Sequence, residues 1–190
     1  KGASKGEGLG NKFLANIRET NAIIHVLRCF DDDNIVHVDG SVDPVRDKET
    51  IDFELQIKDL ETIEKKKVKY EKIAKSGNKD AQKIVSSLEK YISHLENGNS
   101  ARSLVADESD FEAIEDLHLL TSKPILYVCN VDENTLKSSN NHVEAVKNAI
   151  RNEDSEILLI ATAIESEIAE LENVEEQQMF LKEMGLEKPG

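Results

Sequence analysis

The stretch YVCNVDE, residues 127–133, is an apolar run that ends abruptly in polar side chains. In many nucleotide-binding proteins a strand of this kind opens into a base-recognition loop, Asn-Lys-x-Asp, whose Asp accepts hydrogen bonds from two donors on guanine. Here Glu133 takes that place with a side chain one methylene longer, which misplaces the carboxylate for guanine. The Asn130 amide can donate to N7 of adenine and accept from its N6 amino group. Val131 adds apolar surface near the purine, and the loop favours adenine.

Alternating elements after Pro124 position this loop. The apolar spacing predicts strands over 125–129 and 157–160 and helices over 143–150, 164–171 and 174–184. Strand, helix, strand and helix with short links indicate a parallel sheet with crossover helices. Ligands of such sheets bind at the carboxyl ends of the strands, where Asn130 and Thr162 fall. A purely structural explanation is also open, because Thr162 can act as an N-cap with Glu165 completing a capping box.

The first half of the chain is predominantly helical. A helix is expected over 9–18, followed by a strand over 22–29 that is too apolar for an exposed edge. From Thr50 apolar residues recur every three or four positions, and they do so again after residues 76–78. This spacing predicts two long helices in an antiparallel hairpin that bury their apolar stripes against each other. A short return helix is expected over 111–119.

Composition limits the classes of protein that fit. The chain has 190 residues, 38% of them hydrophobic, which is enough for one sizeable core or one domain with a helical insertion. No apolar run approaches the roughly 20 residues that span a bilayer, and the N-terminus lacks a signal-peptide profile. We therefore expect a cytoplasmic location and no membrane partner. Cys29 and Cys129 each end an apolar run and are interpreted as core residues rather than a disulfide or metal pair.

Charge is unevenly distributed along the chain. The net charge of −14 argues against indiscriminate binding to nucleic acid and against DNA specificity. The segment Lys65 to Lys83 is locally basic, with eight lysines: Lys65, Lys66, Lys67, Lys69, Lys72, Lys75, Lys79 and Lys83. This cluster falls around the hairpin tip. It is either a solvated helix surface or a patch that contacts a polyanion such as ribosomal RNA.

The opening stretch KGASKGEGLGNKFLANIRETNAIIHVLRCF resembles the segment after the Asp-x-x-Gly motif in the Obg-related, translation-factor P-loop GTPases. The likeness is specific to their YchF branch, the Obg-like ATPases. It continues through NIVHVDGSVDP, the helical hairpin, NVDE, ATAIESEIAEL and FLKEMGLEKPG, and it covers essentially all 190 residues. The resemblance implies an α/β fold, the parallel-sheet P-loop NTPase (G domain), here incomplete, with an inserted coiled-coil hairpin. The expected segments are a G-domain part at 1–49, the hairpin at 50–120 and a second G-domain part at 121–190.

The family's pattern also implies which parts lie elsewhere. The phosphate-binding loop, the first switch and Asp-x-x-Gly precede the point where this chain begins, and the C-terminal TGS domain is expected beyond Gly190. Residues 6–12 are one residue short of a phosphate-binding loop, and Phe13 stands where its magnesium-binding hydroxyl belongs. We interpret Gly6 to Gly10 as the second switch. ATP and Mg²⁺ are the expected cofactors, with the magnesium ligands upstream, and the chain alone is expected to be inactive.

The resemblance assigns a second base-contacting loop and leaves the catalytic residue open. Thr162, Ala163 and Ile164 resemble the family's Ser-Ala-x-x-Glu element, whose backbone groups frame the purine from the other side. The family lacks the glutamine that orients water in Ras-like enzymes, so histidines are the candidates. His37, in the loop over 34–38, can place a water near the γ-phosphate. The alternative is a hydrogen bond that stabilises the loop, and His25 is expected in the core or an interface.

Two functions remain from different classes of protein. The first is an ATPase of the YchF type that prefers ATP over GTP and hydrolyses it as a regulatory switch linked to the ribosome or to RNA. The second is a non-catalytic interaction module, in which the basic hairpin docks a ribosomal or protein partner and nucleotide has only a structural role.

Overall fold

The computed structural model describes residues 9–137, 139–171 and 173–183, and the chain divides into two compact units. The first unit is drawn from residues 1–23 and 48–125, and the second from residues 24–47 and 126–190. Within the described residues, no helix is both long enough and apolar enough to cross a membrane.

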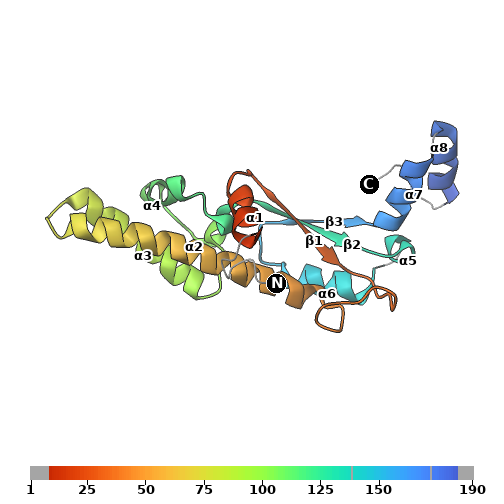
Figure 1. The fold of residues 1–190 in the computed structure, drawn as a ribbon, viewed down its shortest axis with the longest axis horizontal. Coiled ribbons are helices and arrows are strands. Elements are labelled where there is room, and N and C mark those ends of the chain that lie inside the picture. Colours follow the sequence, from red (N-terminus) through yellow and green to blue (C-terminus); the bar gives the residue numbers. More distant parts are fainter. Residues whose placement is uncertain (1–8, 138, 172, 184–190) are drawn as a thin grey trace. The chain divides into compact units, whose positions relative to one another are not determined.

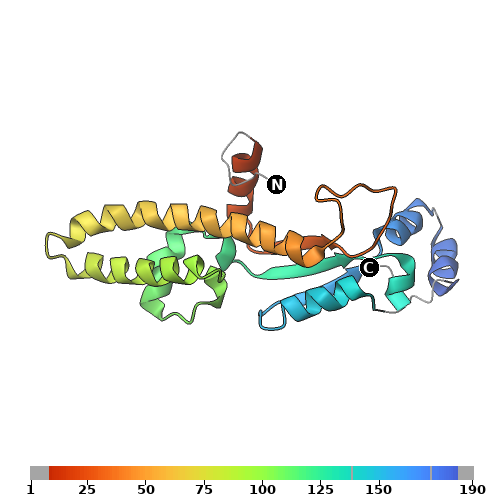
Figure 2. The same ribbon diagram turned by 90° about the horizontal axis from the view of Figure 1, so that it is seen from below.

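Helices make up the first unit. They are α1 (Leu9–Arg18), α2 (Pro44–Ala74), α3 (Lys79–Glu96), α4 (Glu108–Ile114) and three short 3-10 helices, η2 (Ala101–Ser103), η3 (Glu115–Leu117) and η4 (Leu120–Ser122). Both views show α2 and α3 side by side, joined by a turn (Figures 1 and 2). Ile63 of α2 packs in one core with Leu88, Tyr91 and Leu95 of α3. The expected pair of long helices is therefore present, while the knobs-into-holes packing of a coiled coil stays a prediction.

Two helices begin before the expected residues, because residues that cap a helix N-terminus precede the apolar pattern in the sequence. Helix α2 begins at Pro44 rather than Thr50, and the Asp43 carboxylate accepts a 3.0 Å hydrogen bond from the Arg46 amide. Proline at the first helical position has a backbone angle that already suits a helix. Helix α4 begins at Glu108 and ends at Ile114, whereas 111–119 was expected. Its start is set by a capping box between Asp107 and Asp110.

A buried carboxylate joins the helices of the first unit. Asp59 of α2 accepts hydrogen bonds from the Leu120 amide at 2.8 Å, the Thr121 amide at 2.7 Å and the Thr121 hydroxyl at 2.8 Å. The Arg18 guanidinium lies 3.6 Å from the same carboxylate. Burial raises the pKa of Asp59, although these hydrogen bonds and Arg18 act in the opposite direction. Arg18 also donates to four other acceptors: Leu117 O, His118 O, Lys58 O and Thr62 Oγ1.

A three-stranded sheet, in the order β1-β2-β3, organises the second unit. The strands are β1 (Ile23–Arg28), β2 (Ile125–Asn130) and β3 (Glu156–Ile160), and the helices that follow are α5 (Glu133–Lys137), α6 (Asn141–Ala149), α7 (Thr162–Glu170) and α8 (Val174–Glu183). Strands β2 and β3 are parallel, from Leu126 opposite Glu156 to Asn130 opposite Ile160. The expected parallel α/β arrangement is confirmed.

The first strand differs from its prediction, because β1 lies at an edge of the described sheet although it was expected to be too apolar for an exposed edge. In β1 the side chains of Ile24 and Val26 are 66% and 60% exposed, although an apolar strand of this kind was expected to be covered. Alternate side chains of β1 point to opposite faces, and none of the described elements covers the face of these two residues. On the other face, Cys29 and Cys129 are free and fully buried, which confirms them as core residues. The hydrogen bond with Cys129 and burial raise the pKa of the Cys29 thiol.

Candidate nucleotide-recognition site

The carboxyl ends of β2 and β3 bring Asn130 and Thr162 into contact. The parallel register places Asn130 opposite Ile160, just before α7 begins. The Asn130 side-chain oxygen accepts a 3.2 Å hydrogen bond from the Thr162 amide and a 3.0 Å hydrogen bond from the Thr162 hydroxyl. This pair of bonds aims the oxygen at α7 and turns the NH₂ group away from it. The two residues that the sequence placed at neighbouring strand ends are therefore in direct contact.

Within the NVDE loop, the three residues after Asn130 differ in what they offer a ligand. Val131 is only 3% exposed and donates its amide to the Ile160 carbonyl at 2.9 Å, so its side chain belongs to the core. The Asp132 carboxylate accepts from the amide and the hydroxyl of Thr135, both at 2.8 Å, and caps α5. Glu133 is the first residue of α5 and is exposed. A purine bound as the sequence predicts would therefore meet Asn130 and Glu133, and little of the Val131 side chain.

Thr162 does not cap α7, contrary to the expected capping box. The N-cap is Ala161, which makes no side-chain capping bond, and the Thr162 hydroxyl is used by Asn130 instead. Ala163 is exposed in the first turn of α7, whereas Ile164 is buried in the core. Of the three residues predicted to frame a purine, Thr162 and Ala163 are exposed, and their contact with a base stays a prediction.

Asn140 stabilises the loop architecture and was not identified from the sequence. Its NH₂ group donates to the Cys29 carbonyl at 2.7 Å and to the Thr135 hydroxyl at 3.1 Å. Its oxygen accepts from the Val143 amide at 2.8 Å and caps α6. The residue thus links the end of β1, helix α5 and helix α6. The available signal was an asparagine immediately before an amphipathic helix, which is a common N-cap pattern.

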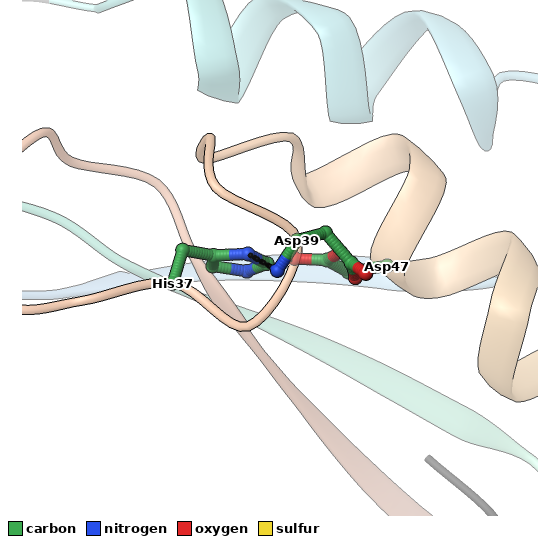
Figure 3. A group of neighbouring side chains, drawn as sticks. All are labelled: His37, Asp39 and Asp47. Carbon is green, nitrogen blue, oxygen red and sulfur yellow. Dashed lines mark hydrogen bonds and ion pairs between the residues drawn. The ribbon is translucent and has the colours of Figure 1, made fainter.

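His37 lies in the loop between β1 and α2 with both ring nitrogens hydrogen-bonded. Nε2 lies 2.9 Å from Oδ2 of Asp47, and the Asp39 amide donates to Nδ1 at 3.1 Å (Figure 3). The Arg28 guanidinium anchors the loop by donating to three carbonyls, those of Phe30, Asp32 and Ile35. The loop therefore has a defined conformation, and the structure contains the stabilising hydrogen bond that was the alternative role for His37.

By distance alone, His37, Asp39 and Asp47 resemble a cation site, since one ligand atom from each lies within 4.8 Å of the others. The ring chemistry argues against metal binding in this conformation. Nδ1 uses its lone pair to accept from the Asp39 amide, so Nε2 carries the proton that faces the Asp47 carboxylate. Neither nitrogen offers a lone pair to a metal unless one of these hydrogen bonds breaks. Hydrogen bonding accounts for the group as it stands.

The other histidines have structural contacts. The His25 ring lies 5.7 Å from the Tyr127 ring, centroid to centroid, in the sheet. His94 Nε2 lies 2.8 Å from the Ser103 hydroxyl, and His142 Nε2 lies 3.1 Å from the Asp31 carboxylate. His118 is the one described residue other than glycine with a positive φ, 46°, after η3.

Ion pairs engage part of the lysine cluster on α2 and α3. Lys66 pairs with Asp116, and Lys67 lies 2.9 Å from Glu89 and 3.6 Å from Glu71. The other six lysines of the cluster are exposed: Lys65, Lys69, Lys72, Lys75, Lys79 and Lys83. The lysines nearest the turn between the two helices are thus open to solvent. The second switch expected at Gly6 to Gly10 lies mostly outside the described residues, and Gly10 itself belongs to α1.

Comparison with known proteins relates the whole chain to one group. No family model matches it. It is 49% identical over 192 residues to the ribosome-binding ATPase YchF of Bacillus subtilis and 46% identical over 190 residues to that of Escherichia coli O157:H7. Each alignment covers all of this chain and 52% of the relative, so the chain spans about half the length of these curated relatives.

A solved structure agrees with the sequence relatives. The Schizosaccharomyces pombe YchF GTPase superimposes with a TM-score of 0.82 at 32% sequence identity, over 95% of this chain and 50% of that one. Sequence and structure thus agree over nearly every residue present, and the expected resemblance is confirmed. Over the residues it contains, this chain belongs to the YchF family.

Proposed function

We propose that this chain supplies the base-recognition half of an ATP-binding domain, and that the full-length protein hydrolyses ATP as a regulatory switch linked to the ribosome. The observation that carries this proposal is the contact between Asn130 and Thr162, which fixes the direction of the Asn130 amide. Its NH₂ group makes no hydrogen bond within the described residues and is the donor that N7 of adenine requires. The two bonds from Thr162 use both lone pairs of the amide oxygen, so the N6 amino group of adenine would take the place of the Thr162 hydroxyl as one of its donors.

The residues present fit adenine better than guanine. Guanine presents an acceptor, O6, where adenine presents the N6 amino group, so the Asn130 oxygen would face another acceptor. Glu133 stands in the first turn of α5, and its side chain is one methylene longer than the Asp of an Asn-Lys-x-Asp loop, which would misplace its carboxylate for the donors of guanine. Asn130, Glu133, Thr162 and Ala163 are therefore the residues proposed to contact the base. Mg²⁺ would be held with the phosphates by residues upstream of this chain, where it would neutralise charge during phosphoryl transfer.

The relatives' names support the rest of the proposal. The curated relatives are called ribosome-binding ATPases, and the solved neighbour is called a GTPase. We infer a cytoplasmic ATPase in which ATP is preferred, GTP is a weaker substrate, and His37 places the attacking water. On this proposal the 190 residues alone bind nucleotide poorly, because phosphate contacts contribute much of the affinity in loop-type sites.

The experiment that tests base recognition compares ATP and GTP affinity. Isothermal titration would use the chain extended upstream through its phosphate-binding loop, with the 190-residue chain as control. We expect the extended chain to bind ATP more tightly than GTP by about 1 kcal/mol or more, and the control to bind neither measurably. Equal affinities for the two nucleotides would contradict adenine recognition by Asn130.

A second function is favoured by a separate observation, the six exposed lysines of the basic cluster. In this alternative the helical pair α2 and α3 docks a ribosomal or protein partner, and nucleotide has only a structural role. Charge reversal of the lysines would then abolish the biological activity, whereas Asn130→Ala would leave it intact. The two functions are separated by assaying both kinds of variant for growth complementation.

A further inference from the structure

We propose that Asp47 and His37 form a catalytic dyad, in which Asp47 is the residue that positions the imidazole. This inference rests on the proposed ATPase function and on His37 as the group that activates water. It assigns Asp47 a role in hydrolysis, although its sequence position at the start of a long helix suggests only a helix-capping carboxylate.

The two hydrogen bonds of His37 determine where its proton lies. A backbone amide can only donate, so the bond from the Asp39 amide requires a lone pair on Nδ1. A carboxylate can only accept, so the 2.9 Å contact between Nε2 and Oδ2 of Asp47 requires a proton on Nε2. The ring is therefore neutral with its proton on Nε2. A carboxylate orients an imidazole base in the same way in hydrolytic triads, although there the two ring nitrogens have the opposite roles.

The bond to Asp47 is the stronger of the two. It is charge-assisted, and the two side chains that form it are partly buried: that of His37 is 18% exposed and that of Asp47 is 29% exposed. Oδ1 of Asp47 also accepts from Nε and Nη2 of Arg46, at 3.3 Å and 3.2 Å. The bond from the Asp39 amide is uncharged, exposed and 3.1 Å long. The Asp39 bond is thus the first to break, and its loss leaves the Nδ1 lone pair free while Asp47 still holds the ring.

The freed Nδ1 can act as a general base. It takes a proton from water as the water oxygen bonds to the γ-phosphorus of ATP, and the bond from that phosphorus to the β,γ-bridging oxygen breaks with its electron pair on ADP. The products are ADP and inorganic phosphate, and the proton on Nδ1 passes to solvent. During the step the ring is an imidazolium, which the Asp47 carboxylate stabilises through the proton on Nε2.

The test measures ATP hydrolysis and ATP binding in the full-length protein for Asp47→Ala, His37→Ala and the double variant. We expect Asp47→Ala to lower kcat about tenfold to a hundredfold, with ATP affinity within about twofold of wild type. The double variant should have the kcat of His37→Ala, because Asp47 acts only through His37. Glu49→Gln is the matched control, since Glu49 is an exposed carboxylate on the same turn with no hydrogen bond in the described residues.

Asp47→Asn guards against misfolding, because asparagine keeps the size of the side chain and one acceptor oxygen for Nε2. It loses the acceptor for Arg46 and the charge that stabilises an imidazolium. A folded Asp47→Asn variant with reduced kcat and normal ATP affinity supports the dyad. The dyad would be overturned if His37→Ala is impaired while Asp47→Ala or Asp47→Asn has a kcat equal to or above that of the wild type. That result would show that His37 acts without Asp47. Wild-type kcat in His37→Ala removes His37 from the mechanism, whereas absence of ATP binding in the wild type refutes the proposed function itself.

Discussion

The side-chain oxygen of Asn130 accepts two hydrogen bonds from Thr162, which lies 32 positions further along the chain. Both residues stand at the carboxyl ends of adjacent parallel strands, so the sheet brings them together without any contact nearby in sequence. The bonds remove the ambiguity in the orientation of an amide side chain, because the donors of Thr162 can only face its oxygen. On the proposed function, a nucleotide base at this edge would therefore meet a pre-oriented NH₂ donor.

Replacement of Asn130 tests this geometry. Asn130→Ala removes both the donor and the acceptor proposed for adenine, and we expect ATP binding to weaken by about 1–3 kcal/mol. Titration of the full-length protein with ATP measures the effect. Asn148→Ala is the matched control, because Asn148 is an exposed asparagine on α6 whose side chain makes no hydrogen bond in the described residues. ATP affinity equal to wild type in Asn130→Ala would remove this residue from the site.

Thr162→Val tests whether the orientation of the amide matters. The substitution keeps the shape of the side chain and the backbone amide bond, but it deletes the hydroxyl bond to Asn130. We expect a smaller loss of ATP affinity than in Asn130→Ala, about 1 kcal/mol or less, together with a reduced preference for ATP over GTP. Competition between the two nucleotides measures this preference. An unchanged preference would show that Thr162 does not orient the base-reading group.

The sequence predicted the parts of the site that depend on periodicity and strand ends. Strands β2 and β3 and the positions of Asn130 and Thr162 follow from apolar runs followed by polar residues. The hydrogen-bond partner of the Thr162 hydroxyl could not be predicted. From the sequence, this hydroxyl was expected to cap α7, and only the folded sheet brings the Asn130 oxygen close enough to accept from it instead. Val131 was similarly ambiguous, because an apolar residue after a strand can face a ligand or the core, and here it is buried.

Asp59 provides a test of the first unit. Asp59→Ala would leave the buried amides of Leu120 and Thr121 without their acceptor and Arg18 without its ion pair. We expect the free energy of unfolding to fall by about 3–5 kcal/mol, as when one partner of a buried pair is removed. Chemical denaturation measures the loss, and Glu64→Ala, an exposed glutamate on the same helix, serves as the control. A loss no larger than that of the control would show that Asp59 does not stabilise this unit.

The lowered pKa of Asp110 predicts how the free energy of unfolding depends on pH. Burial alone would raise its pKa, but hydrogen bonds from Lys90, Ser87 and the Asp107 amide outweigh burial, and the pKa is lowered from its ordinary value of 3.8. Because the folded state binds this proton less readily, the stabilisation is complete above the ordinary pKa and is lost as pH falls through the lowered value. We expect Asp110→Asn to destabilise the protein at neutral pH and to approach wild-type stability in acid. Urea denaturation of the wild type and of Asp110→Asn, from neutral pH down to acid, measures the difference in their free energies of unfolding. A difference that does not change with pH would contradict the lowered pKa of Asp110.

Charge reversal at the turn between α2 and α3 tests the partner surface. Lys72, Lys75 and Lys79 are exposed, in contrast to Lys66 and Lys67, which are paired with acidic side chains. If the exposed lysines neutralise phosphates, replacing all three with glutamate should weaken binding to ribosomes and flatten its dependence on salt, by about 0.7–0.9 in log-log slope for each phosphate that is no longer neutralised.

ATP affinity should stay within about twofold of wild type, because the substitutions lie in the first unit and the base-reading residues in the second. Arg151→Glu, which reverses an exposed charge on the second unit, controls for a general electrostatic effect. Ribosome binding with an unchanged salt slope in the triple variant would mean that the lysines are a solvated surface and that the partner binds another face.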